Sequence, residues 1–318
     1  MIVIDQEQRI FTLHTSHTTY QMQADPYHVL LHAYYGPRVE EDMTYLIRRA
    51  DRSHTPNPDE AGNRRDYSLD TLPQEYSTCG VGDYRIPSLE VEQADGSHAV
   101  DLRYTGYEVR KGKYTLEGLP AFWGQEAETL ILFLEDPASH VVAELYYGVF
   151  EDVDLITRAV RIVNRGEKPV RLLKAASLCL DLPYAAPLDI ITFAGRHMME
   201  RCPTRTPLAP GIQGVGTTRG LSSHQNNPFV MLCRPDAGEE HGLCYGAMLL
   251  YSGSFEAMAE RSQLEDCRLV MGINPYHFSW TLEPGGAFQT PEAAMVCSPS
   301  GFGQMSRRFH RAIREHLL

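Results

Sequence analysis

The middle of the chain reads TRAVRIVN at 157–164, RGEKP at 165–169 and VRLLKA at 170–175. The first and third pieces are rich in residues that favour strands, with charged side chains recurring between apolar ones. The piece between them contains a glycine and a proline, which favour a turn. We therefore predict a β-hairpin in which the two strands pair across 165–169, with one charged face.

Short strand-like stretches of this kind recur along the whole chain and are separated by turns, such as EPGG at 283–286. Many short strands with few helical patterns between them predict a mainly β fold, a large antiparallel sandwich. A doubly wound α/β fold would need long helical patterns between the strands, which we do not find. The other stretches that we expect to be strands are 10–15, 19–23, 129–134, 141–147, 229–233, 244–251, 269–273, 277–282 and 288–290.

The carboxyl end differs from the rest because apolar residues recur there at helical spacing. These residues are Phe302, Met305, Phe309, Ala312, Ile313 and Leu317. We expect the sandwich to occupy 1–298 and a helix to occupy 299–318.

Composition excludes several classes of partner. The formal net charge is −12 and the isoelectric point is about 5.5, which argues against nucleic acid and anionic membrane surfaces and favours a neutral substrate. The chain lacks a recognisable targeting segment and an apolar run long enough to cross a bilayer. Its seven cysteines are scattered and form no Cys-x-x-Cys pair, which favours reduced thiols. We expect a cytoplasmic location.

No catalytic constellation stands out from the residues alone. With 41 acidic residues, a pair of carboxylates cannot be chosen from the sequence, and Asp70 and Asp181 are interpreted as turn formers. His28 and His32 are four residues apart without a third ligand nearby, so we interpret them as structural. We expect no metal and no cofactor. Core positions are expected for the two tryptophans, Trp123 and Trp280.

Two polar stretches are candidates for binding. Residues 48–70 carry many charged side chains and almost nothing apolar, which is typical of a surface loop or of a loop that contacts a ligand. The stretch SSHQNNPF at 222–229 supplies neutral donors and acceptors that suit sugar hydroxyls. A loop that satisfies its own backbone explains the second stretch equally well.

Several ordered blocks of the chain resemble the bacterial α-galactosidases of glycoside hydrolase family 36. The resemblance implies a large β-supersandwich, similar to galactose mutarotase, that precedes a (β/α)₈ catalytic barrel in enzymes that are commonly tetramers. The blocks include TPNPD at 55–59, SLDTLPQEY at 68–76, GDYRIP at 82–87, DLRY at 101–104, GLPA at 118–121, EAETL at 126–130, SSHQNNPF at 222–229, MGINP at 271–275 and FQTPE at 288–292.

The resemblance implies hydrolysis of terminal α-1,6-galactosides, such as melibiose and raffinose, by a retaining mechanism. The family's two catalytic aspartates lie on its barrel, so we expect none in residues 1–318. Matching the motifs places the family's substrate contacts at Asp51 and Arg65, with Arg64 as an alternative to Arg65. A position that is tryptophan in some members falls on His197, where an imidazole would bind a hydroxyl instead of stacking.

The expected partners are therefore α-galactoside oligosaccharides, the barrel and other subunits of a homotetramer. The carboxyl-terminal helix should lead toward the barrel and expose an apolar stripe that the barrel covers. Three alternatives remain open: a stand-alone galactoside-binding sandwich without catalysis, a complete sandwich enzyme with its own acid and base, and an oligomerisation scaffold.

Overall fold

The chain is built almost entirely from antiparallel strands, and the predicted mainly β class is confirmed. The computed structural model describes residues 1–47, 51, 59–62, 64–183 and 187–318. Its helical elements are the 3-10 turns η1 (Thr44–Leu46) and η2 (Asp59–Ala61) and the helix α1 (Gly301–His316). All seven cysteines are free, and five of them are buried.

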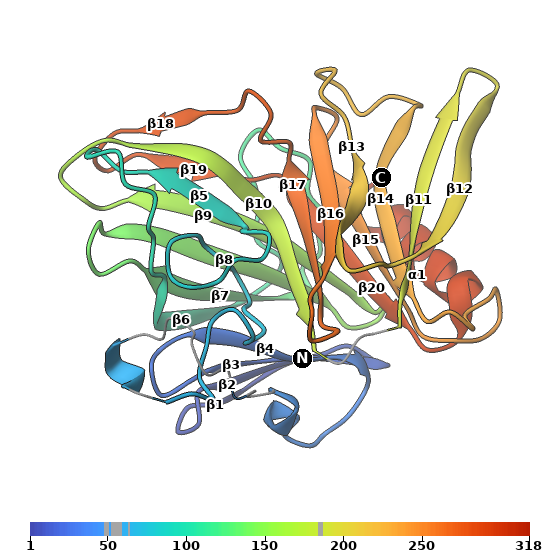
Figure 1. Ribbon diagram of the computed structural model, residues 1–318. Coiled ribbons are helices and arrows are strands. Elements are labelled where there is room, and N and C mark those ends of the chain that lie inside the picture. The colour runs from blue at the N-terminus through green and yellow to red at the C-terminus, as the bar shows by residue number, and fades with distance from the viewer. Residues whose placement is uncertain (48–50, 52–58, 63, 184–186) are drawn as a thin grey trace.

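The strands form three sheets (Figure 1). The four-stranded sheet has the order β1 (Ile2–Asp5), β2 (Ile10–His14), β3 (Thr18–Ala24) and β4 (Leu30–Pro37). The six-stranded sheet has the order β13 (Gly211–Gly216), β16 (Phe255–Arg261), β17 (Cys267–Ile273), β10 (Val170–Leu182) and β18 (Trp280–Leu282), with β5 (Leu89–Glu92) also paired to β10. The ten-stranded sheet has the order β12 (Met199–Pro207), β11 (Asp189–Arg196), β14 (Asn226–Cys233), β15 (Cys244–Leu250), β20 (Glu292–Ser298), β9 (Leu155–Asn164), β8 (Val141–Phe150), β7 (Glu128–Glu135) and β6 (Arg103–Lys111), with β19 (Ala287–Gln289) also paired to β9.

One continuous apolar core joins the three sheets. The ten-stranded sheet contributes Leu145 and Ile162, the six-stranded sheet contributes Leu178 and Val270, and the four-stranded sheet contributes Phe11. The four-stranded sheet lies below the other two in Figure 1 and contacts both through β4. Central strands such as β8 and β9 are buried on both faces, so their sequences lack the clean alternation of a half-exposed strand.

The predicted hairpin across 165–169 is wrong. Strand β9 pairs with β8, β20 and β19, whereas β10 pairs with β17, β18 and β5. The chain therefore crosses from one sheet to the other at this turn, and β9 and β10 contact each other face to face. The turn at 283–286 makes a second crossing in the same place, since β18 pairs with β10 and β19 with β9.

Asn164 joins these two crossings. Its side-chain Nδ2 donates to the carbonyl oxygens of Lys168 (2.8 Å) and Leu282 (2.9 Å), and its Oδ1 accepts from the Gly166 N–H at 3.0 Å. Its backbone N–H donates to the Gly286 carbonyl at 3.0 Å, and its own carbonyl accepts from the Gly285 N–H at 2.8 Å. The side chain is fully buried, so one residue satisfies the buried polar groups of both turns.

The carboxyl-terminal helix lies against the sandwich, and the expected exposed apolar stripe is not present. Met305, Phe309 and Ala312 of α1 are buried in a cluster with residues of β14, β15 and β20. Arg308, also buried, forms an ion pair with Asp154 at 2.8 Å. The ten-stranded sheet therefore covers the apolar face of α1, which we had expected the barrel to cover. Among the described residues, no helix has the length and apolar character that crossing a bilayer requires.

The two tryptophans are not in the core. Trp123 is 57% exposed and Trp280 is 50% exposed. Trp280 lies on the short outer strand β18, and its ring contacts Phe288 with centroids 5.5 Å apart. The prediction failed for Trp280 because strand membership does not say which face of an edge strand is covered, and Trp123 lies in the loop between β6 and β7.

Replacing Asn164 by alanine should lower the free energy of unfolding by about 2–4 kcal/mol, because buried carbonyl and N–H groups of both turns would lose their partners. Urea unfolding followed by circular dichroism measures this change. Glu167→Ala, at an exposed position of the same turn, is the matched control and should change the value by less than about 0.5 kcal/mol. Equal effects of the two substitutions would contradict the role given to Asn164.

Candidate functional site

Asp51 and Arg65 form an exposed ion pair. The Arg65 Nε donates to the Asp51 Oδ1 at 3.0 Å, and the side chains are 64% and 63% exposed. Arg64, the alternative to Arg65, is directed instead to Asp66, with Nη2 and Oδ2 2.6 Å apart. Exposed pairs of this kind contribute about 0–1 kcal/mol, so a ligand hydroxyl can replace one partner at little cost. Residues 55–58 of the TPNPD block lie outside the described residues.

Buried contacts on either side of Arg65 hold this pair against the sandwich. Tyr67 is fully buried, its hydroxyl donates to the Asp25 Oδ2 at 2.6 Å, and its ring contacts Tyr27 at 4.8 Å. Ala61 of η2 packs in the same apolar cluster. The backbone at Arg65 is therefore positioned by its neighbours, while its guanidinium faces solvent.

His197 lies at the tip of the β11–β12 hairpin. It is exposed, and Met198 beside it has a left-handed backbone with φ of 61°. The Met198 N–H donates to the Glu200 Oε1 at 2.9 Å, which closes the turn. The register of the two strands shifts between Ala194 and Arg196, so the tip is bent by a bulge.

The structure does not bring these predicted contacts together. In Figure 1 the β11–β12 hairpin projects at the upper right, whereas η2, which leads into Arg65, lies at the lower left. The hairpin that carries His197 and the segment around η2 therefore lie on opposite sides of the molecule. Within one copy they cannot contact the same monosaccharide.

The polar stretch at 222–229 lies beside the hairpin. The Gly195 N–H of β11 donates to the Gln225 carbonyl at 3.1 Å. Asn226 donates through Nδ2 to the Gly216 carbonyl of β13 at 2.8 Å, so it has a structural role. Asn227, the next residue, has a buried Nδ2 without a hydrogen-bond partner in the structure. Two adjacent asparagines thus differ in what they do.

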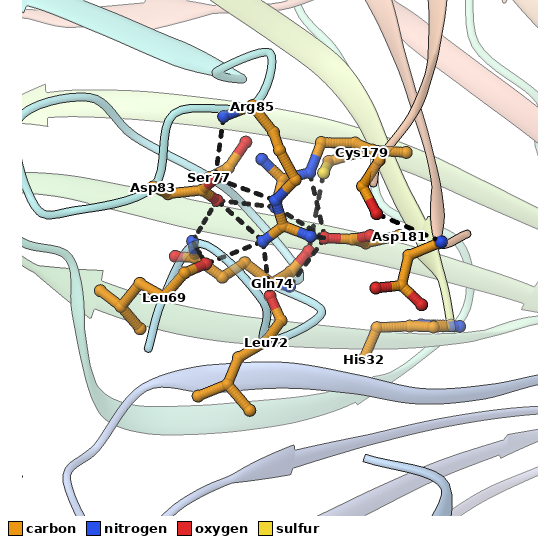
Figure 2. A network of polar contacts seen from close by, with 12 residues as sticks. His32, Leu69, Leu72, Gln74, Ser77, Asp83, Arg85, Cys179 and Asp181 are labelled. Atoms are coloured by element: carbon orange, nitrogen blue, oxygen red, sulfur yellow. Dashed lines mark hydrogen bonds and ion pairs between the residues drawn. The ribbon is translucent and has the colours of Figure 1, made fainter. Parts of the chain in front are cut away.

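A buried ionic network lies beneath the loop that follows Tyr67 (Figure 2). Arg85 contacts Asp83 at 3.0 Å and Asp181 at 3.3 Å, and it donates to the carbonyls of Leu69 (2.8 Å) and Leu72 (2.7 Å). Gln74 donates to Asp83 at 2.6 Å. These contacts tie the loop to the interior of the sandwich.

A second buried arginine, Arg268 on β17, completes that network. Its Nη2 lies 2.7 Å from the Asp83 Oδ2 and 2.6 Å from the Asp181 Oδ2. Asp181, on β10, is therefore fully buried and paired with two arginines, Arg85 and Arg268. Its interpretation as a turn former is wrong. The sequence signal was its place inside an apolar run, where an ionised carboxylate needs a cation.

Glu75 accepts four contacts in the neighbouring part of the core. Arg158 Nη1 lies 2.6 Å from its Oε1, the hydroxyls of Tyr20 and Tyr147 each donate at 2.7 Å, and the His32 Nδ1 is 3.3 Å from its Oε2. Burial alone would raise the pKa of Glu75, but the Arg158 guanidinium and the contact with His32 outweigh it, so the pKa is lowered. The interpretation of His32 as structural agrees with this contact.

The same balance lowers the pKa of Asp83, where burial is outweighed by Arg268 and Arg85. A glycosidase general acid requires a raised carboxyl pKa. Glu75 and Asp83 show the opposite shift and are enclosed by cations and hydroxyls, so we assign both a structural role.

One group of side chains has metal-ligand chemistry. Among the described residues, Asp152, Glu315 and His316 place one ligand atom each within 4.8 Å of one another. Arg311 already contacts both carboxylates, at 3.3 Å from Asp152 and 3.0 Å from Glu315. Because the guanidinium already binds oxygens of both carboxylates, we assign no metal to this group.

Fold and site together define a large β-sandwich domain with polar contacts on projecting loops. The chain matches the glycosyl hydrolase family 36 N-terminal domain over residues 28–283. It therefore belongs to this family of glycosidase amino-terminal domains.

Individual relatives agree with that assignment. The chain is 45% identical over 318 residues to the bifunctional α-galactosidase/sucrose kinase AgaSK of Mediterraneibacter gnavus, covering 99% of this chain and 34% of the relative. It is 40% identical to the α-galactosidase AgaA of Geobacillus stearothermophilus, covering 96% of this chain and 42% of that protein. The chain thus spans less than half the length of these curated relatives.

Solved structures show the same fold. The galactosidase domain of AgaSK superimposes with a TM-score of 0.97, covering 99% of this chain and 44% of that one. A variant of AgaA solved in complex with raffinose superimposes with a TM-score of 0.93 at 40% identity, covering 97% of this chain and 43% of that one.

The buried network predicts a loss of stability in acid. Because the folded-state pKa of Glu75 lies below its ordinary value of 4.5, its contribution is complete above that value and is lost as the pH falls toward the folded-state pKa. Glu75→Gln should lower the free energy of unfolding at neutral pH by about 3–5 kcal/mol, because Arg158 would stay buried and unpaired.

The variant should also lose less stability than the parent between about pH 5 and pH 3. Urea unfolding across that range measures both effects. Glu167→Gln, at an exposed position, is the control and should follow the parent. A variant whose acid dependence equals that of the parent would show that Glu75 does not have a depressed pKa.

Proposed function

We propose that this chain is the amino-terminal domain of an α-galactosidase that hydrolyses terminal α-1,6-galactosides by a retaining mechanism. The observation that carries the proposal is the match to the galactosidase domain of AgaSK along 99% of the chain. The raffinose complex of the AgaA variant supports the substrate class. The acidic net charge is compatible with a neutral oligosaccharide and with a cytoplasmic enzyme.

The nucleophile and the acid/base are proposed to lie on a catalytic barrel outside residues 1–318. The chain covers only 34% to 44% of its first relatives, which leaves room for a further domain. Glycoside hydrolysis needs two carboxylates on either side of the scissile bond. Glu75, Asp83 and Asp181 are buried and paired with arginines, so they cannot reach a bound sugar.

The contribution of this domain is proposed to be substrate contact at the mouth of the pocket. Asp51 can accept hydrogen bonds from vicinal hydroxyls, Arg65 can donate two, and the His197 imidazole can bind one hydroxyl. Because the β11–β12 hairpin, which carries His197, and the segment around η2 lie on opposite sides of the molecule, one substrate could meet His197 and the Asp51–Arg65 pair only in a homo-oligomer. We propose the tetramer for this reason, with the contacts supplied by different subunits.

A stand-alone galactoside-binding module is the second candidate. The half-exposed rings of Trp123 and Trp280 favour it, because a flat aromatic face can cover the apolar face of a pyranose. Such a module would bind galactosides without cleaving them.

The first test is an assay of the folded 318-residue chain with p-nitrophenyl α-galactoside. We expect no release of nitrophenol, because the catalytic carboxylates would lie outside the chain, and we expect turnover when a barrel is present. Turnover by the purified chain alone would refute the proposal. Binding of galactose by the chain without turnover in any longer form would favour the stand-alone module.

Substitution of Asp51 by alanine in a form that carries the barrel should lower kcat/KM for raffinose about 10- to 100-fold, since hydrogen bonds to a charged group contribute about 1.5–3 kcal/mol. Arg65→Ala should act in the same direction. Arg64→Ala, the adjacent arginine paired with Asp66, is the matched control and should leave the kinetics unchanged. Unaltered kinetics in Asp51→Ala would remove both residues from the site.

A further inference from the structure

The loop between β6 and β7 has its two ends joined to each other. The Gly112 N–H donates to the Ala127 carbonyl at 2.7 Å, and the Lys113 N–H donates to the Gly124 carbonyl at 2.9 Å. A surface loop of this length whose ends lie together is an Ω-loop, and it can move without displacing the strands on either side. We call residues 112–127 the strap.

The strap packs on the outer face of the ten-stranded sheet through a small apolar cluster of its own. Tyr114 and Leu116 are buried there with Ala159 of β9, and Tyr146 of β8 packs against them. Ala159 lies on the face of β9 opposite to Val160, which belongs to the main core. Because the two clusters are separate, the strap can leave the sheet while the sandwich stays closed.

One buried carboxylate holds both ends of the strap. Glu292, at the start of β20, accepts from the Phe122 N–H through Oε2 at 2.6 Å. Its Oε1 forms an ion pair with the Lys113 Nζ, and the Lys113 and Glu292 side chains are 1% and 0% exposed. The lysine stem passes over Gly148 of β8, where a Cβ would collide with it. Lys113 therefore reaches Glu292 only because position 148 is glycine.

The strap is also bound to the end of α1. The Trp123 N–H donates to the His316 carbonyl at 2.8 Å, and the His316 Nδ1 lies 3.1 Å from the Trp123 carbonyl oxygen. His316 is the last residue of the helix. Departure of the strap would remove both contacts and leave the last turn of α1 without this support.

The ammonium of Lys113 is costly to bury. Burial lowers its pKa from the ordinary 10.5 to about 8, and Glu292 offsets only part of this effect. Glu292 of β20 and Tyr114 of the strap face the ammonium, β8 contributes the uncharged Gly148, and Arg158 of β9 acts on Tyr114. Burial raises the pKa of Tyr114 well above 10, so this ring stays neutral when Lys113 titrates.

We propose that the strap is a conformational device that detaches from the sheet as one unit and thereby releases the end of α1. The Lys113–Glu292 ion pair holds it closed. In a detached strap the ammonium is exposed and binds its proton more tightly, so proton uptake favours detachment and a rising pH favours closure. Below about pH 7 both forms are protonated, and the balance stays constant. The proposal does not depend on the proposed function.

Hydrogen exchange of the 318-residue chain, followed by mass spectrometry, measures this opening. Peptides from the strap should be less protected than peptides from β8, because the strap opens without the sandwich. Their protection factors should rise about 10-fold between pH 7 and pH 9 and stay constant between pH 6 and pH 7. Peptides from the last turn of α1 should show the same rise.

Three variants isolate the ion pair. Lys113→Met keeps an apolar stem and removes the ammonium, so the strap should stay protected and its pH dependence should vanish. Glu292→Gln leaves the ammonium without a counter-ion and should lower the protection of the strap at least about 10-fold at pH 7, with β8 unchanged. Lys111→Met, at an exposed position of β6, is the matched control and should behave like the parent.

Exchange of the strap at the rate of β8 would overturn the proposal, because the strap would then open only with the whole sandwich. Equal pH dependence in the parent and in Lys113→Met would show that the ion pair does not control the opening. A last turn of α1 that does not follow the strap would refute the link to the helix. None of these results bears on the proposed function, which the nitrophenol assay tests separately.

Discussion

Two arginines buried between the sheets, Arg158 and Arg268, impose the constraint on which the rest of the structure depends. A guanidinium without a counter-ion cannot be accommodated in an apolar core, so the chain must deliver carboxylates to both positions. Glu75 and Asp83 come from the loop after Tyr67, and Asp181 comes from β10. That loop is therefore held inside the sandwich by ion pairs. The surface residues just before it, Arg64 and Arg65, are positioned as a result.

Local periodicity predicted where strands lie but not which strands pair. The stretches at 157–164 and 170–175 are strands, yet they belong to different sheets, because a turn of five residues suits a crossing between layers as well as a hairpin. The charged positions were misleading in the same way. In the sequence, Arg158 and Lys174 are typical of a strand face exposed to solvent, but each is buried and paired with a glutamate. Because these glutamates are distant in the sequence, no local pattern indicates the pairing.

The candidate site divides along similar lines. Asp51, Arg65 and His197 could be chosen from the sequence because each lies beside a short motif that resembles the family's. Their roles remain predictions. The buried network of Arg85, Asp181 and Arg268 could not be named, because it joins segments that lie far apart in the sequence. Motif matching recognises segments, whereas a buried ionic network is a property of how those segments pack.

The two crossings joined by Asn164 have a consequence for synthesis. The Asn164 amide and its acceptor on Leu282 are 118 residues apart, and a ribosome adds about 5–20 residues per second. Roughly 6–24 s therefore separate the appearance of the two partners. For most of that interval β9 and β10 have been synthesised, but Leu282 and the second crossing have not. The nascent chain thus carries unpaired strand edges during translation, when chaperones that shield such edges are most needed.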